Sequence, residues 1–179
     1  MKSTFEQSAV AKKFVLQWGE LGTKWGINRT VAQIHALLYF SERPLTAGEI
    51  AQTLSVAQSN VSTSLRELQG WRLIRVVPVM GDRKEHFESL KDIWEMFKVV
   101  LDERKRREVD PALEMLRECV AELGQSPADA HMAERLTAMK EFFEDSSAWY
   151  NEIKPIPISV LRKMMRLGSK VQKFLGVSS

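Results

Sequence analysis

The sequence is poor in cysteine and in long apolar runs, and both shortages restrict the classes of protein it can belong to. Its 179 residues include a single cysteine, Cys119, which cannot form a disulfide within one chain and favours a reducing compartment. No run of about 18 apolar residues is present, and the first residues contain no apolar signal core. We therefore expect a cytoplasmic protein without stable membrane insertion.

The sequence also lacks the residue patterns of catalysis and metal binding. Its three histidines, His35, His86 and His131, have no paired ligand spacing, and there is no glycine-rich phosphate loop or nucleophile elbow. His35 falls near an apolar helical stripe, where a packed or half-exposed side chain is expected. We expect a protein that is not an enzyme and that needs no cofactor or metal.

Charge is unevenly distributed along a chain whose composition is otherwise that of a folded protein. Hydrophobic residues make up 44% and charged residues 27%, with a net charge of +3. Residues 1–88 hold the whole positive excess, whereas residues 154–179 contain six basic residues and no acidic one. Two basic regions therefore need an explanation.

The first half of the chain has helical periodicity up to Pro44. An amphipathic helix is predicted to end near Gly19 to Gly22, and a second helix is predicted from Val31 to about Phe40. The second helix ends before Pro44, because a residue that precedes proline is pushed out of the helical region.

Residues 46–68 have the pattern of two helices joined by a tight turn. Thr46 and Glu49 have the spacing of a capping box, which predicts a helix start. The three residues from Ser55 to Ala57 form the turn, and Val61, Leu65 and Leu68 define the buried face of the next helix.

The periodicity changes to that of strands after Trp71. Residues 73–79 are rich in β-branched side chains, residues 81–84 form a polar turn, and residues 85–88 can return as a partner strand. Pro78 restricts its strand to a sheet edge or a bulge. The fold class expected is mainly α, with a winged helix-turn-helix, a short β-hairpin wing and an extended helical dimerisation region.

From Ser89 onward the sequence predicts helices, with breaks at Asp110-Pro111, at 124–127 and at 155–157. Asp110 and Ser126 stand directly before prolines, as N-caps do. The helices carry three apolar seams that need facing partners, and a second subunit can supply them. We expect residues 1–88 to form the N-terminal helix and DNA-binding domain, and residues 89–179 to form the dimerisation region.

Several segments, in this order and spacing, resemble the GbsR-type branch of the MarR-like winged-helix regulators. The resemblance is carried by residues 25–30, 44–46, 49–51, 60–62, 65–68, 81–84 and 103–111. It implies a dimeric, DNA-binding transcriptional regulator, more often a repressor, which in some members responds to a small ligand such as choline.

The sequence departs from this family at two positions of the helix-turn-helix. Ala57-Gln58 replaces a frequent Ser-Lys pair, which removes a side-chain cap and a cation from the start of the second helix. Arg72 replaces a frequent glycine at the turn after Trp71, where a non-glycine residue in a left-handed conformation costs about 1 kcal/mol, so either the turn differs or the positive charge near DNA offsets this cost.

Polar side chains on the second helix and at the wing tip are the candidate DNA contacts. Asn60 suits adenine, Arg66 suits guanine or phosphate, and the wing tip can reach the minor groove or its phosphates. The alternative for the same surface is a solvated polar helix used for protein contacts. The predicted DNA-binding residues are Gln58, Ser59, Asn60, Ser62, Thr63, Arg66, Arg83 and Lys84.

Aromatic residues allow a second, smaller prediction. Trp18, Trp25, Trp94 and Phe97 could line a pocket for a small cationic effector, since aromatic faces attract quaternary ammonium ions. Plain core packing explains the same residues and is the interpretation we favour.

The basic segment from Val160 to Leu175 is amphipathic and suits either a dimer arm or an interfacial membrane helix. The function expected is a homodimeric regulator that binds a roughly palindromic operator. The alternative is a non-catalytic interaction adaptor, with the winged module on protein and the basic helix on a membrane surface.

Overall fold

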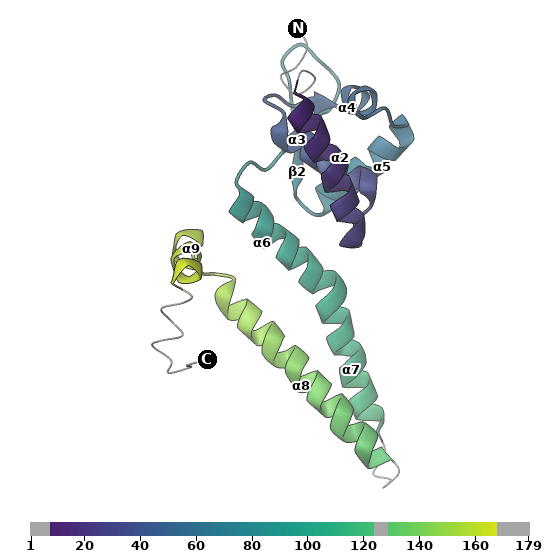
Figure 1. The fold of residues 1–179 in the computed structure, drawn as a ribbon. Helices are drawn as coiled ribbons and strands as arrows, with labels where there is room; N and C mark the ends of the chain where they lie inside the picture. The colour runs from purple at the N-terminus through teal and green to yellow at the C-terminus, as the bar shows by residue number, and fades with distance from the viewer. Residues whose placement is uncertain (1–7, 124–128, 168–179) are drawn as a thin grey trace. The chain divides into compact units, whose positions relative to one another are not determined.

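The computed structural model describes residues 8–123 and 129–167, which form two compact units (Figure 1). The first unit ends at Val99 and the second begins at Val100, inside helix α6 (Ile93–Arg104). The described residues are mostly helical, with one small antiparallel sheet. This confirms the predicted fold class, a mainly α chain with a winged helix-turn-helix.

Helices α2 (Ala9–Lys24) and α3 (Arg29–Phe40) pack closely against each other in the first unit. The prediction that the first helix ends near Gly19 to Gly22 is wrong. Both glycines are buried inside α2, and a Cβ atom on Gly22 would lie 2.6 Å from the Cβ of Ala32. They permit close helix packing, and the left-handed residue that follows the helix is Gly26, with φ +74°.

The helix-turn-helix consists of α4 (Ala47–Leu54) and α5 (Gln58–Gly70). The predicted capping box is confirmed: the Glu49 N–H donates to Thr46 Oγ1 at 3.2 Å, and the Thr46 N–H donates to Glu49 Oε2 at 2.8 Å. The three-residue turn is also confirmed, and Ser55 starts it in the left-handed conformation with φ 54°.

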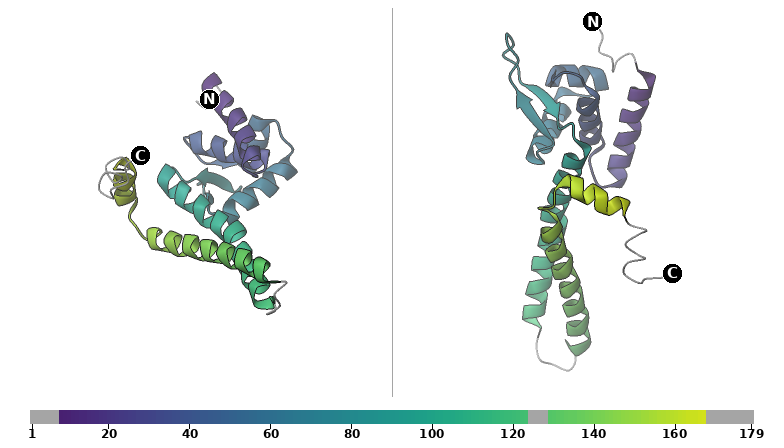
Figure 2. Two further views of the ribbon diagram at one scale, coloured as in Figure 1. Left: turned by 60° about the horizontal axis from the view of Figure 1, so that its bottom comes forward. Right: turned by 90° about the vertical axis from the view of Figure 1, so that its left-hand side faces the viewer.

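The wing is part of a sheet of three antiparallel strands in the order β1-β3-β2. Strands β2 (Ile74–Val77) and β3 (His86–Ser89) form the predicted hairpin, which projects from the first unit in the right-hand view of Figure 2. Strand β2 lies at the edge and ends before Pro78, in agreement with the restriction that proline imposes. Strand β1 (Leu45–Thr46) is too short to show any periodicity, and the sequence did not predict it.

The core of the first unit joins α3, α4, α5 and the sheet. Its apolar side chains hold the second helix of the helix-turn-helix against the sheet and α3, so that the polar face of that helix is turned outward. The most deeply buried residues of this core are Ile34, Leu37, Leu38, Ile50, Val61 and Leu68.

The second unit contains a continuous helix, so the predicted break and N-cap at Asp110-Pro111 are wrong. A π-helical turn, η1 (Lys105–Val109), joins α6 to α7 (Asp110–Glu122), and Asp110 has helical angles with no side-chain cap at the junction. The Asp110 N–H donates to the carbonyl of Lys105, five residues earlier. This wider turn lets the helix accept Pro111, which has no N–H and whose ring crowds the preceding turn.

Helix α8 (Ala130–Ile153) returns along α7, and α9 (Ile158–Arg166) follows the confirmed break at 155–157. The predicted break at 124–127, with Ser126, lies outside the described residues. The Tyr150 hydroxyl donates to Asp102 Oδ1, and Lys154 Nζ lies 3.0 Å from the same oxygen, which ties α8 to α6. Within residues 8–123 and 129–167, no helix is both long enough and apolar enough to cross a membrane.

Candidate nucleic-acid interface

Helix α5 presents a polar face to solvent and an apolar face to the core. Val61, Leu65 and Leu68 are buried, as the periodicity predicts, whereas Ser59, Thr63 and Arg66 are exposed. At 100° per residue these three exposed positions lie opposite the core-facing ones. The helix starts at Ala57 without a side-chain cap, which confirms that the Ala57-Gln58 replacement leaves its first turn uncapped.

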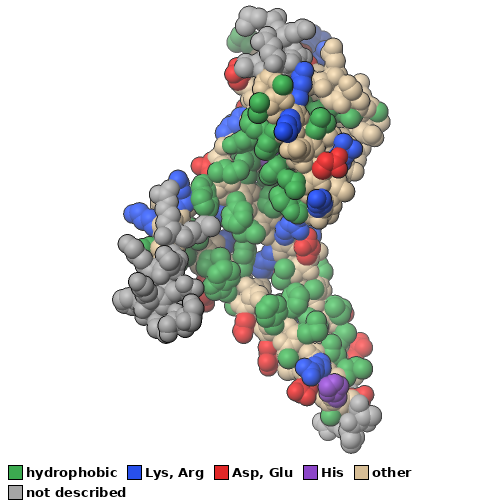
Figure 3. Space-filling model, in the orientation of Figure 1, with side chains coloured by type: hydrophobic (Ala, Val, Ile, Leu, Met, Phe, Trp, Pro, Cys, Tyr) green, Lys and Arg blue, Asp and Glu red, His purple; other side chains and the backbone are tan. Residues whose placement is uncertain are grey.

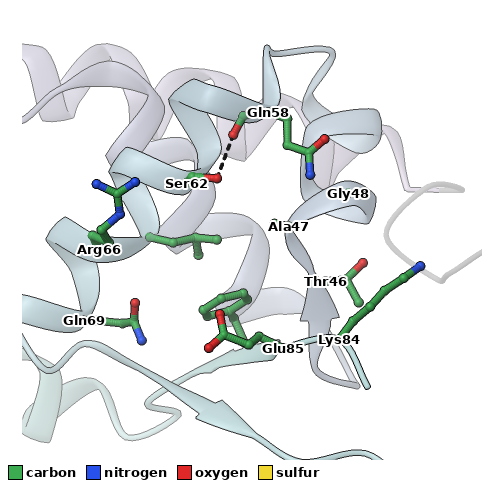
Figure 4. Close-up of a pocket in the computed structure, with 11 residues that line it drawn as sticks. Thr46, Ala47, Gly48, Gln58, Ser62, Arg66, Gln69, Lys84 and Glu85 are labelled. Atoms are coloured by element: carbon green, nitrogen blue, oxygen red, sulfur yellow. Dashed lines mark hydrogen bonds between the residues drawn. The ribbon is translucent and has the colours of Figure 1, made fainter. Parts of the chain in front are cut away.

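One side of α5 borders an open pocket of about 520 Å³ between α4, α5 and the wing (Figure 4). Gln58, Ser62 and Arg66 approach it from α5, and Lys84 approaches it from the wing. Leu65 and Phe87 supply apolar lining, and Thr46 to Gly48 contribute the start of α4. The arrangement brings four of the predicted DNA-binding residues together around one hollow.

The other side of α5 faces the start of α3. Asn60 and Thr63 line a hollow of about 200 Å³ together with Asn28, Thr30 and Glu67. The predicted residues of α5 are therefore distributed over two sides of the helix, with Ser59, Thr63 and Arg66 along the outer stripe between them.

The side chain of Asp82 stabilises the turn at the tip of the wing. Asp82 Oδ1 accepts a hydrogen bond of 2.9 Å from the Lys84 N–H, and Gly81 adopts the left-handed conformation with φ +83°. The other carboxylate oxygen of Asp82, Oδ2, lies 3.6 Å from Nε2 of His86. Both Arg83 and Lys84 are exposed at the tip.

The arginines of the first unit divide into two groups according to their partners. Arg29, Arg43 and Arg75 form ion pairs with Glu20, Glu49 and Glu88 at 2.8, 2.6 and 2.5 Å. The three others, Arg66, Arg72 and Arg83, have no ion pair with any described residue. They lie on α5, directly after α5 and at the wing tip, so the arginines of this unit without an ion pair to a described residue are those of the helix-turn-helix and its wing.

Hydrogen bonds to the carboxylate of Glu49 also stabilise the start of α4, which borders this surface. The hydrogen bond from Arg43 lowers the pKa of Glu49 to about 2, and the bonds from Thr46 act in the same direction against the effect of burial. Glu49 is therefore ionised at neutral pH and holds the first turn of α4 as an acceptor.

Sequence reasoning missed several residues that border the pocket. Gln69 continues the helical series of Gln58, Ser62 and Leu65, so its spacing could have identified it. Glu85 and the Thr46 to Gly48 segment come from separate elements, and only the fold brings them there.

The four aromatic residues proposed for an effector take part in ring contacts. Trp18 stacks on Phe14 at 5.3 Å and meets Trp25 edge-on at 5.7 Å, and Trp94 meets Phe97 at 6.4 Å between ring centroids. Trp25 and Phe97 are exposed, and apolar side chains gather over α2 on the face drawn in Figure 3. The effector pocket stays a prediction.

The comparisons with known proteins agree with this geometry. The model of the MarR family matches residues 25–85. The HTH-type transcriptional repressor GbsR of Bacillus subtilis (strain 168) is 24% identical over 140 residues, which cover 76% of this chain and 77% of the relative. A crystal structure of a transcriptional regulator, 21% identical, superposes with a TM-score of 0.54 over 79% of this chain and 98% of that one.

The matched segment starts directly before α3 and ends in the wing, so it contains the helix-turn-helix and most of the hairpin. Residues 25–85 of this chain are therefore similar to the MarR family, and 76% of the chain is similar to a transcriptional repressor.

Proposed function

We propose that this chain is a homodimeric transcriptional repressor that binds a roughly palindromic operator through α5 and the wing. The observation that carries the proposal is the outer stripe of α5, where Ser59, Thr63 and Arg66 lie exposed between two hollows. Small donors and acceptors on a slim helix suit the major groove of DNA, and the cations of the wing suit phosphates or the minor groove.

The dimer is supported by the uncovered apolar surface of α8. None of its 24 residues is buried in the single chain, and Met132, Met139, Phe142 and Trp149 are between 52% and 67% exposed. Their spacing places them on one side of the helix. A second copy would cover this side, and two copies would set their α5 helices about 34 Å apart, the distance between successive major grooves.

Selection of bound sequences from random duplexes tests the proposal. We expect the selected sites to have two-fold symmetry, with half-site centres about 10 base pairs apart, and affinity to fall steeply with salt. Arg66→Ala should weaken binding by about 10-fold or more, and Lys13→Ala, which removes one exposed charge from α2, serves as the control. Absence of any sequence preference, or an Arg66→Ala variant that binds like its parent, contradicts the proposal.

The same measurements separate the regulator from the adaptor. Binding to anionic vesicles that requires residues 159–175, without preference for any duplex, would replace the regulator by the adaptor.

A further inference from the structure

Two residues at the end of α5 each lower the stability of the folded protein. Gly70 is the last residue of the helix, where glycine is a poor helix former, and Arg72 takes the left-handed conformation with φ 59°, which glycine adopts without strain. The capping pattern itself is regular, with the Arg72 N–H donating to Gln69 at 2.9 Å and the Leu73 N–H donating to Leu68 at 3.0 Å. Glycine stands two residues before the position that favours it.

Among residues 8–123 and 129–167, no contact requires a glycine at position 70. A Cβ atom placed there meets no heavy atom within 4 Å, in contrast to Gly19 and Gly22, where a Cβ would collide with α3. Position 70 also does not need a positive φ, since the left-handed residues of this region are Ser55 and Arg72. The described part of the chain therefore gives no packing reason for the glycine at this position.

Gly70 lies on the outer stripe of α5. At 100° per residue, position 70 continues the direction of Ser59, Thr63 and Arg66, the exposed side chains of the proposed DNA surface. Arg72 is exposed and belongs to the three arginines of the first unit without an ion pair to a described residue. The last residue of α5, Gly70, therefore has no side chain, and the exposed guanidinium group of Arg72 follows two positions later.

We propose that the end of α5 is a close-approach contact for the sugar–phosphate backbone of DNA. Gly70 admits the backbone without a side chain in the way, and Arg72 pairs with a phosphate. This inference rests on the proposed DNA-binding function and assigns it two positions that act on affinity rather than on base choice. The stability lost at both positions is then offset by binding.

The proposal predicts that stability and affinity change in opposite directions. Gly70→Ala and Gly70→Gln should each raise the Tm by about 2–4 °C, because both side chains favour helix and meet open space. The same variants should weaken DNA binding, by about 3-fold for alanine and about 10-fold or more for the longer glutamine. Gln17→Ala, at an exposed position of α2, is the control and should leave affinity unchanged.

Variants of Arg72 separate the effect of its charge from the effect of its left-handed backbone conformation. Arg72→Gly should raise the Tm by about 2–4 °C and reduce the affinity several-fold, with a shallower dependence on salt. Arg72→Ala should reduce affinity to the same extent without raising the Tm, and Arg72→Lys should retain most of the binding.

Fluorescence anisotropy with a selected duplex at two salt concentrations, together with thermal unfolding, decides the outcome. If the parent protein binds no duplex with sequence preference, the proposed function and this inference both fail. If the parent binds and the Gly70 and Arg72 variants bind as tightly, only this inference is overturned.

Discussion

Lys91 donates a hydrogen bond of 2.9 Å from its Nζ to the carbonyl oxygen of Leu38, 53 positions earlier in the chain. The same ammonium group donates to the carbonyls of Tyr39 and Ser41 at 2.9 and 2.8 Å. These carbonyls belong to the last turn of α3 and its cap, where helical hydrogen bonds are missing and the helix dipole is negative. One side chain after β3 therefore caps the central helix of the winged domain.

Lys91→Met should lower the free energy of unfolding by about 1–2 kcal/mol, because three carbonyls lose a charged donor. Chemical denaturation at neutral pH measures the loss. Lys13→Met, at an exposed position of α2, should change stability by less than about 0.5 kcal/mol. Equal stability of the Lys91→Met variant and its parent would show that water replaces the ammonium group without cost.

His35 should make the first unit sensitive to acid. Its Nε2 atom is buried without a hydrogen-bond partner among the described residues, and burial, reinforced by the charge of Lys91, lowers its pKa to about 4. Folding therefore favours the neutral ring. The stability that this provides is complete above the unfolded pKa of 6.5 and is lost as the pH falls from 6.5 towards 4.

His35→Leu removes this titration. Between pH 7 and pH 4, the parent should lose on the order of 2 to 3 kcal/mol more unfolding free energy than the variant does. Glu49 acts in a lower window, since its lowered pKa gives stability that is lost below about pH 4.5 in both proteins. A difference that stays constant from pH 7 to pH 4 contradicts the prediction.

Gly22 should not tolerate a side chain. Gly22→Ala places a methyl group 2.6 Å from the Cβ of Ala32, so α2 and α3 must separate. We expect a loss of about 1–3 kcal/mol in unfolding free energy, and a larger loss for Gly22→Val. Gln17→Ala on the same helix should be neutral or slightly stabilising, and a stable Gly22→Val protein would mean that the two helices can move apart freely.

The exposed face of α8 should control the oligomeric state. Phe142→Glu combined with Trp149→Glu places charge on the surface that a second copy would cover, and the dimer dissociation constant should rise at least about 10-fold. Sedimentation velocity over a concentration series measures this change. Glu141→Arg, on an exposed polar position of the same helix, is the control, and a variant that remains as dimeric as its parent places the interface elsewhere.

Local signals in the sequence were sufficient for the helix-turn-helix and the wing. The Thr46 and Glu49 capping box, the three-residue turn and the spacing of Val61, Leu65 and Leu68 each depend on residues at most a few positions apart, and the structure contains all of them. The family resemblance left two alternatives open for Arg72, and the structure shows that it adopts the left-handed conformation, with φ 59°.

Long-range packing decided the features that the sequence did not reveal. Gly19 and Gly22 look like a helix end, but α3 approaches them so closely that only glycine fits within a continuing helix. Asp110-Pro111 looks like a break, but a π-helical turn carries the helix through it. The division of α5 into two polar sides also depends on where α3, α4 and the wing lie, since periodicity fixes the direction of a side chain but not its neighbours.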